Sequence, residues 1–164
     1  MSALASEHNQ REPDRSVQPR AGKAAFPRSA RLLRHADFER VYERGKRHFS
    51  ASMTVFYWPR TEADRREAKS PALSGLRVGF TVGRALGGAV QRNRMKRRLR
   101  EAVRLSLPSS PVSADVVINP KKSLLSTDFA ALLNEVSRAF VVIEQKLGQR
   151  ADPELPKKND ASVR

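Results

Sequence analysis

The sequence contains no cysteine among its 164 residues. Disulfides and thiolate metal sites are therefore excluded, as is typical of a cytosolic protein. Long hydrophobic runs are also absent. The first twenty residues, MSALASEHNQREPDRSVQPR, lack the apolar stretch of a secretory signal, and no continuous apolar span is long enough to cross a membrane. We therefore expect a cytoplasmic protein with no membrane association.

Acidic residues are scarce relative to basic ones. Lys and Arg number 32 against 17 Asp and Glu, which gives a formal net charge of +15. A basic excess of this size favours nucleic acid as the partner. An anionic membrane surface is the main competitor, but it needs a strongly amphipathic helix with bulky apolar anchors, and the sequence offers none.

Composition divides the chain into one folded domain and two tails. Residues 1–25 are polar, charged and without an apolar period, so we predict a disordered tail. Apolar anchors begin near Phe26 and continue to Leu147. Residues 26–147 are therefore predicted to fold as a single domain, and residues 148–164 to form a second disordered tail.

The predicted domain alternates helical and strand patterns. We expect a helix from about His35 or Asp37 to Arg44, strands at Phe49–Trp58, Leu76–Val82 and Val116–Ile118, a basic helix ending near Pro108, and a last helix from Ser126 or Thr127 to Leu147. Residues 60–75 are predicted to be a polar loop. The α-β-β-α-β-α order indicates an α+β domain whose sheet carries helices on one face.

Alternation assigns the first strand two faces. Phe49 is placed with Met53, Val55 and Tyr57, whereas Ser52 and Thr54 are placed with Ser50 and Phe56.

The basic helix carries the strongest functional pattern. At 3.6 residues per turn, its cations form one stripe, and its apolar residues lie on the opposite side. The stripe holds Asn93, Arg97, Arg100 and Arg104 with Arg94 and Lys96 beside it, and the apolar side holds Met95, Leu99, Ala102 and Val103. Like charges at i,i+4 repel, and a polyanionic partner would remove that cost.

Plainer explanations compete with RNA binding for these residues. A solvated charged face normally mixes signs, but no acid occurs from Arg92 to Arg100, so RNA contact is favoured. Asn93 alone could equally be a polar residue near a helix start. The glycines at 83, 87 and 88 are not followed by the Lys-Ser/Thr pair of a phosphate loop, so we interpret them as turn residues.

The entry to the basic helix and the helix itself hold a motif of fixed spacing, which comprises Arg84, Gly87, Ala89, Val90, Arg92, Asn93, Arg94, Met95, Lys96, Arg97, Arg100 and Glu101. Upstream, Phe26, Pro27 and Arg28 precede Arg31, Leu32 and Leu33, and then Asp37, Phe38 and Tyr42. Together these residues resemble the signature of the protein subunit of bacterial ribonuclease P. The resemblance covers about Phe26 to Leu147.

The resemblance implies a fold similar to the second domain of ribosomal protein S5, with a left-handed β-α-β crossover. The general rule favours the right-handed form, so spacing could not have indicated that hand. It also implies that the protein joins a catalytic RNA that removes the 5′ leader from precursor tRNA, with the active site on the RNA.

The resemblance also implies which residues bind RNA. Contacts to the catalytic RNA fall on Arg84, Arg92, Asn93, Arg94, Lys96, Arg97 and Arg100. The single-stranded leader would lie in a cleft between the first helix and the sheet, lined by Phe38, Tyr42, Ser52 and Thr54. From the residues alone, Phe38 and Tyr42 would be assigned to the core.

Two departures from the family pattern affect its cations. Asn119 and Pro120 precede Lys121 and Lys122 where adjacent basic residues are common, which shifts that contact by a residue. Gly88 and Ala85 replace a polar residue and a lysine at the entry to the basic helix, so one cation is missing there.

The sequence indicates no catalytic residues and no protein-held metal. His8, His35 and His48 lack ligand spacing with carboxylates, and no nucleophile and base form a constellation. Mg²⁺ would be held through the RNA subunit, whose phosphates suit it. Two alternatives stay open: a structural ribosomal protein that binds folded rRNA, and an endonuclease that acts alone with metal.

Overall fold

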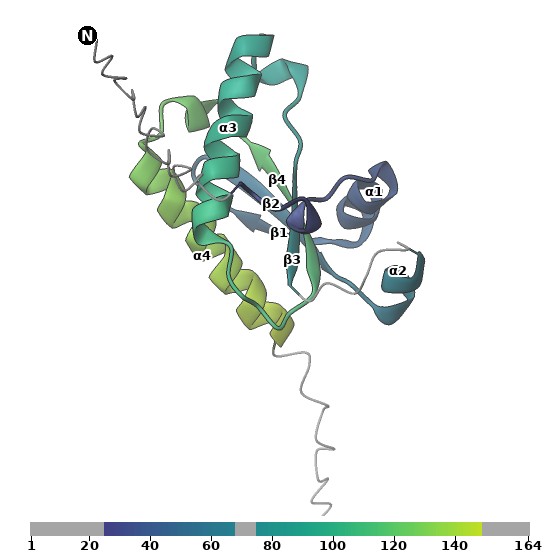
Figure 1. Ribbon diagram of the computed structural model, residues 1–164. Coiled ribbons are helices and arrows are strands. Elements are labelled where there is room, and N and C mark those ends of the chain that lie inside the picture. The colour runs from purple at the N-terminus through teal and green to yellow at the C-terminus, as the bar shows by residue number, and fades with distance from the viewer. Residues whose placement is uncertain (1–24, 68–74, 149–164) are drawn as a thin grey trace, which may run out of the picture.

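The computed structural model describes residues 25–67 and 75–148 (Figure 1). The elements in chain order are η1 (Arg28–Ala30), α1 (His35–Arg44), β1 (Lys46–Phe49), β2 (Met53–Pro59), α2 (Glu62–Glu67), β3 (Leu76–Phe80), η2 (Arg84–Leu86), α3 (Ala89–Ser106), β4 (Ala114–Pro120), η3 (Lys122–Leu125) and α4 (Phe129–Gly148). The predicted disordered tails, residues 1–25 and 148–164, lie outside the described residues except for Ala25 and for Gly148, which ends α4.

The four strands form one mixed sheet in the order β1-β2-β4-β3. β1 pairs antiparallel with β2, and β2 pairs antiparallel with β4, whereas β3 and β4 are parallel. Parallel neighbours need a crossover connection, which α3 supplies between β3 and β4. The result is a small mixed sheet, and the prediction of a single α+β domain is confirmed. The left hand of the crossover stays an expectation from the resemblance.

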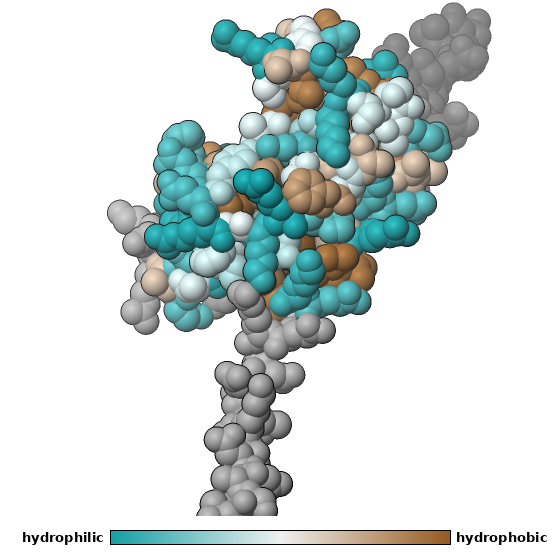
Figure 2. Space-filling view, turned by 180° about the vertical axis from the view of Figure 1, so that it is seen from behind, coloured by the Kyte–Doolittle hydropathy of each residue, from teal (hydrophilic) through white to brown (hydrophobic). Residues whose placement is uncertain are grey.

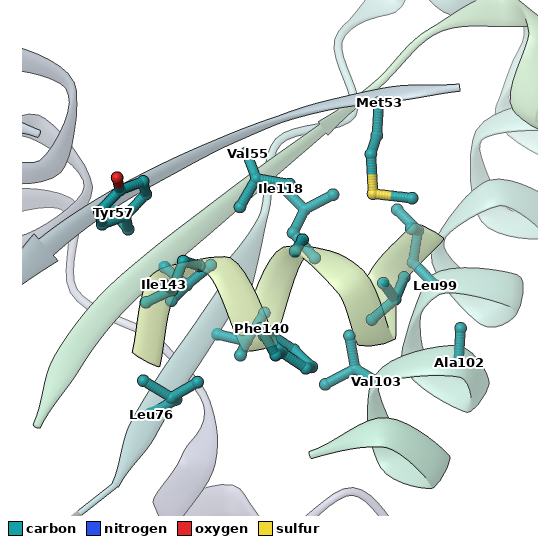
Figure 3. Close-up of a cluster of buried hydrophobic side chains, with 14 of the residues drawn as sticks. Met53, Val55, Tyr57, Leu76, Leu99, Ala102, Val103, Ile118, Phe140 and Ile143 are labelled. Carbon is teal, nitrogen blue, oxygen red and sulfur yellow. The ribbon is translucent and has the colours of Figure 1, made fainter. Parts of the chain in front are cut away.

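The main core lies between one face of the sheet and the helices α3 and α4 (Figure 3). Met53, Val55 and Tyr57 alternate along β2 and are fully buried, as the period-2 pattern predicts. They face Phe140 and Ile143 of α4. The apolar side of α3, made of Met95, Leu99, Ala102 and Val103, is also buried here, which confirms the predicted helix orientation. The opposite side of α3 is thereby turned towards solvent.

Helix α1 covers the other face of the sheet, which corrects the prediction that all helices share one face (Figure 1). Val41 of α1, Leu32 and Val117 of β4 form a second, smaller buried cluster there. The prediction failed because β4 is buried on both faces. Its continuous apolar run therefore indicates burial but not which helix lies on which side.

The predicted strand at Phe49–Trp58 is two strands. The chain turns after Phe49, and the Ser50 N–H donates to the Met53 carbonyl at 2.9 Å. β1 escaped prediction because its residues Lys46, Arg47 and His48 lie at the sheet edge and show no apolar alternation. Phe49 pairs with Thr54, so its side chain belongs to the Thr54 face and not to the Met53 face.

The predicted loop at 60–75 contains the short helix α2. Thr61 caps it, because the Asp64 N–H donates to Thr61 Oγ1 at 3.2 Å and the Thr61 N–H donates to Asp64 Oδ2 at 2.8 Å. This reciprocal pair is a capping box, and the Thr-x-x-Asp spacing was its available sequence signal. At the other end of the chain, Gly148 is the last residue of α4 and does not follow it.

Candidate nucleic-acid interface

The entry to α3 depends on a glycine turn. Gly87 has φ +134°, and a Cβ there would lie 1.9 Å from Gln91 Oε1. Only glycine fits at this position. Gln91 in turn accepts a hydrogen bond of 3.1 Å from the Gly88 N–H, which satisfies one of the donors at the helix start. The interpretation of these glycines as turn residues is confirmed at Gly87.

The solvent-facing side of α3 carries the predicted cations. Asn93, Arg94, Arg97 and Arg100 are exposed, whereas Arg92 and Lys96 are half-buried. Within the described part of the chain, Arg94, Arg97 and Arg100 form no ion pair with an acid. Arg84 is exposed in η2, which contacts α3. The structure thus brings the six predicted cations and Asn93 to one helix and the turn that precedes it.

Arg98 has a different role from its neighbours. Its guanidinium donates to the carbonyls of Leu124 at 2.6 Å and Leu125 at 3.1 Å, and also to the carbonyl of Thr127. These bonds tie α3 to η3 and to the start of α4. Arg98 is therefore a structural cation inside a basic run, which residue type alone could not have indicated.

The C-terminal half of the α3 face borders a cavity of about 230 Å³. Arg97 and Arg100 line it together with Arg31, whose Nη2 donates to the Phe26 carbonyl at 2.7 Å and whose guanidinium lies 5.5 Å from the Phe26 ring centroid. Glu101 also lines it but makes two hydrogen bonds with Arg104, of 3.0 and 2.6 Å. The cavity is consequently positive and suits an anion such as a phosphate.

Phe38 and Tyr42 lie side by side on α1, over the second face of the sheet. Both are half-buried, and both pack against the cluster of Leu32, Val41 and Val117. The Tyr42 ring meets Phe56 edge-on, with centroids 4.9 Å apart. The two predicted aromatics thus have one buried side, as core residues do, and one side towards solvent, as the lining of the predicted leader cleft would have.

Polar residues from α1, from β4 and from the segment after β3 meet at one end of the predicted leader cleft, which we call the groove. The Tyr42 hydroxyl lies 2.7 Å from Asn119 Oδ1 on β4 and 2.7 Å from Thr81 Oγ1 just after β3. A tyrosine hydroxyl has one proton, so it donates to Asn119 and accepts from Thr81. Thr54 is the register partner of Asn119 and lies on the same face. Asn119, a departure from the family pattern, therefore lies beside Thr54 on the face of the sheet that α1 covers.

Ser52 does not lie in the groove with the other predicted residues. It is buried, and its hydroxyl and its N–H both donate to Glu135 Oε2 of α4, at 2.7 and 3.1 Å. Ser52 therefore faces the side opposite α1. The prediction placed it by strand alternation with Thr54, but Ser52 belongs to the turn before β2, where alternation does not hold.

A network of paired charges lies under α1. Arg77 of β3 donates two hydrogen bonds of 2.8 Å to buried Asp115 of β4 and lies 3.5 Å from Asp37 of α1. Burial raises the pKa of Asp115 above its ordinary value, although the bonds and charge of Arg77 act in the opposite direction. Asp37 also lies 3.2 Å from Arg40 of the same helix, so its contact with Arg77 is the one that ties α1 to the sheet.

These carboxylates do not form a metal site. Asp37 and Asp115 are paired with arginines, a donor set that does not fit Mg²⁺. Within residues 25–67 and 75–148 there is no group of three or more His, Asp and Glu side chains able to hold a metal ion.

No helix in the described ranges is long and apolar enough to cross a membrane. The surface seen from behind is mostly hydrophilic, with apolar side chains in small separate patches (Figure 2).

Comparisons with known proteins agree on one family. The family model of ribonuclease P matches residues 26–144. The ribonuclease P protein component of Chloroflexus aggregans is 41% identical over 116 residues, which cover 66% of this chain and 78% of that protein. That of Desulfovibrio desulfuricans is 42% identical over 99 residues, which cover 59% of this chain and 68% of the relative.

Solved structures show the same fold. The ribonuclease P protein of Thermotoga maritima is 28% identical and aligns with a TM-score of 0.51, covering 66% of this chain and 96% of that one. The Staphylococcus aureus protein is 24% identical, with a TM-score of 0.53 and coverage of 72% and 96%. Given a family match over residues 26–144 and relatives above 40% identity, this chain belongs to the ribonuclease P protein component family.

Proposed function

We propose that this protein is the RNA-binding, non-catalytic subunit of ribonuclease P. In this account α3 contacts the catalytic RNA, and the groove between α1 and the sheet holds the single-stranded 5′ leader of precursor tRNA. The RNA subunit then cleaves the leader to give the mature 5′ end. Such a subunit works where precursor tRNA is processed, in the bacterial cytoplasm.

The observation that carries the proposal is the short path between the two surfaces. Thr81 bonds Tyr42 at the polar end of the groove, and only three residues later Arg84 begins η2, which leads into α3. An RNA strand that leaves the groove at Thr81 would meet Arg84 and the cations of α3. One protein can thereby hold the leader and the catalytic RNA at once, because its cations offset the repulsion between their phosphates.

The groove supports a single strand in preference to a duplex. Phe38 and Tyr42 offer aromatic sides on which unpaired bases can stack, at roughly 1–3 kcal/mol per base. Asn119 and Thr54 add polar groups on the floor. Bases in a duplex are stacked on each other and cannot use such a surface.

The side chains also support catalysis by the RNA subunit and not by the protein. Asp37 and Asp115, the buried carboxylates near the groove, are engaged by arginines, so they are not poised to act as a base or to bind metal. We therefore assign Mg²⁺ to the RNA subunit, whose phosphate oxygens are the ligands it prefers.

Cleavage of a precursor tRNA at low Mg²⁺ tests this function. The catalytic RNA, the full-length protein and both together are compared on the same substrate. We expect cleavage to be stimulated only when both components are present. Cleavage by the protein alone would support the metal-dependent endonuclease. Tight binding to rRNA with no stimulation would support the structural ribosomal protein.

A further inference from the structure

Phe49 is the most exposed aromatic residue among the large apolar side chains of the described chain, at 68% of its surface. It ends β1, and its register partner on β2 is Thr54. Paired residues in an antiparallel ladder project to the same face. Phe49 therefore points to the face of the sheet that carries the groove.

A single exposed apolar residue needs no explanation by itself. Phe49, however, belongs to a row of paired residues that crosses the sheet. Thr54 pairs with Phe49 on one side and with Asn119 on the other. Neighbouring strands are about 4.8 Å apart, so Phe49 lies roughly 10 Å across the sheet from Asn119. The row thus runs from Phe49 over Thr54 to the polar end of the groove at Asn119 and Tyr42.

Two cations lie close to Phe49. Arg47 precedes it by two residues on the same face, and its guanidinium lies 5.3 Å from the Phe56 ring centroid. Lys121 follows β4, and its Nζ donates to the Ser50 carbonyl at 2.9 Å, directly after Phe49. An exposed aromatic ring with cations nearby is the combination that proteins use to bind unpaired nucleotides, with the base on the ring and the phosphates on the cations.

We propose that Phe49 is a stacking platform for an additional unpaired nucleotide of the strand in the groove, with Arg47 and Lys121 contacting its flanking phosphates. The inference rests on the proposed function, because the strand in question is the 5′ leader of precursor tRNA. The platform lengthens the groove by one strand of the sheet, out to its β1 edge. Longer leaders therefore gain a contact that short leaders cannot reach.

The side of β1 that faces α4 supplies a control. Phe49 also borders a cavity of about 670 Å³ between the β1–β2 hairpin and α4, which His48, Asn134 and Arg138 line as well. Asn134 lies on α4, away from the groove face. A leader that crossed the sheet edge into this cavity would depend on Asn134, whereas a leader on the Thr54 face would not.

The test measures the affinity of the reconstituted holoenzyme for precursor tRNAs whose leaders are lengthened one nucleotide at a time. Wild type is compared with Phe49→Leu, which keeps an apolar side chain but removes the ring, and with Phe49→Tyr, which keeps the ring. Asn134→Ala and Val141→Ala, the latter an exposed apolar residue of α4, are the controls. Thermal midpoints and affinity for the RNA subunit are measured for every variant.

We expect Phe49→Leu to weaken binding of long-leader precursors about fivefold, the lower end for loss of one stacked base. Binding of short-leader precursors and of mature tRNA should not change, and Phe49→Tyr should bind as wild type does. Unchanged affinity of Phe49→Leu for every leader would overturn the platform while leaving the proposed function intact. A comparable loss in Asn134→Ala would overturn its placement on the groove face. A wild-type holoenzyme that ignores the leader would overturn the proposed function and the platform together.

Discussion

Phe38 on α1 packs directly onto the backbone of Gly79 on β3. A Cβ at Gly79 would lie 2.5 Å from Phe38 Cζ and 2.8 Å from Cε1, closer than non-bonded carbon atoms approach. Gly79 has no positive φ, so its role is steric and not conformational. The position of the Phe38 ring, and with it one wall of the groove, is therefore set by the absence of a side chain on the neighbouring strand.

Gly79→Ala should move Phe38 and alter the groove. Overpacking of this kind costs about 1–3 kcal/mol of folding free energy, and the displaced ring should also weaken binding of leader-bearing precursor relative to mature tRNA. The control is the same change in a Phe38→Ala background, where the ring no longer blocks the added methyl group and Leu32 Cβ, 3.0 Å away, is the nearest remaining neighbour. Denaturant unfolding of the four proteins gives the coupling energy. Equal destabilisation by Gly79→Ala in both backgrounds would contradict the contact.

The exposed cations of α3 should account for part of the salt dependence of RNA binding. Arg97→Ala combined with Arg100→Ala removes two phosphate contacts, so the slope of log affinity against log salt should become shallower by about 1.4–1.8. The thermal midpoint should hardly change, since both side chains are exposed. Arg138→Ala combined with Lys146→Ala removes the same charge from α4 and should leave the slope unaltered. An equal change in both pairs would indicate that only net charge matters.

Arg98→Ala should behave in the opposite way from its neighbours on α3. It removes hydrogen bonds to the carbonyls of Leu124, Leu125 and Thr127, and bonds from a charged donor are the stronger kind. We expect a loss of about 2–3 kcal/mol in the free energy of unfolding. The salt slope of RNA binding by the folded protein should be preserved. A changed slope with unaltered stability would show that Arg98 contacts RNA.

His48 should make the fold sensitive to mild acid. Partial burial, followed by the charges of Lys146 and Arg138, lowers its pKa in the folded protein. The unfolded chain then binds more protons just below pH 6.5, so stability falls as the pH drops through that value towards the folded pKa. His48→Gln should flatten the dependence of the thermal midpoint on pH between about 7 and 5. An identical pH dependence in the variant would exclude His48 as the cause.

The sequence was most informative where one pattern carried both packing and function. The period of α3 predicted its buried side at Met95 and Leu99 and its exposed side at Arg97 and Arg100, because a helix with two chemically distinct sides has one way to face a core. The aromatics Phe38 and Tyr42 were placed on α1 correctly. Their spacing shows a shared face but not how much of each ring stays exposed.

The failures came from residues whose roles depend on contacts distant in sequence. Ser52 was expected in the leader cleft from the resemblance and beside Thr54 from strand alternation. A turn intervenes, however, and Glu135, 83 positions away, binds its side chain. Asn119 appeared only as a departure from a basic pattern, and its contact with Tyr42 arises from the pairing of β2 with β4. Strand pairing is a tertiary property, so no local pattern could have indicated either contact.

The position of the leader on the protein is the most direct test of the account. A reconstituted holoenzyme is photo-crosslinked to a precursor tRNA that carries 4-thiouridine at single leader positions, and the crosslinked peptides are identified by mass spectrometry. The account predicts crosslinks in α1, β1 and β2, with α3 covered by the catalytic RNA. Leader crosslinks confined to α3 or α4 would contradict it.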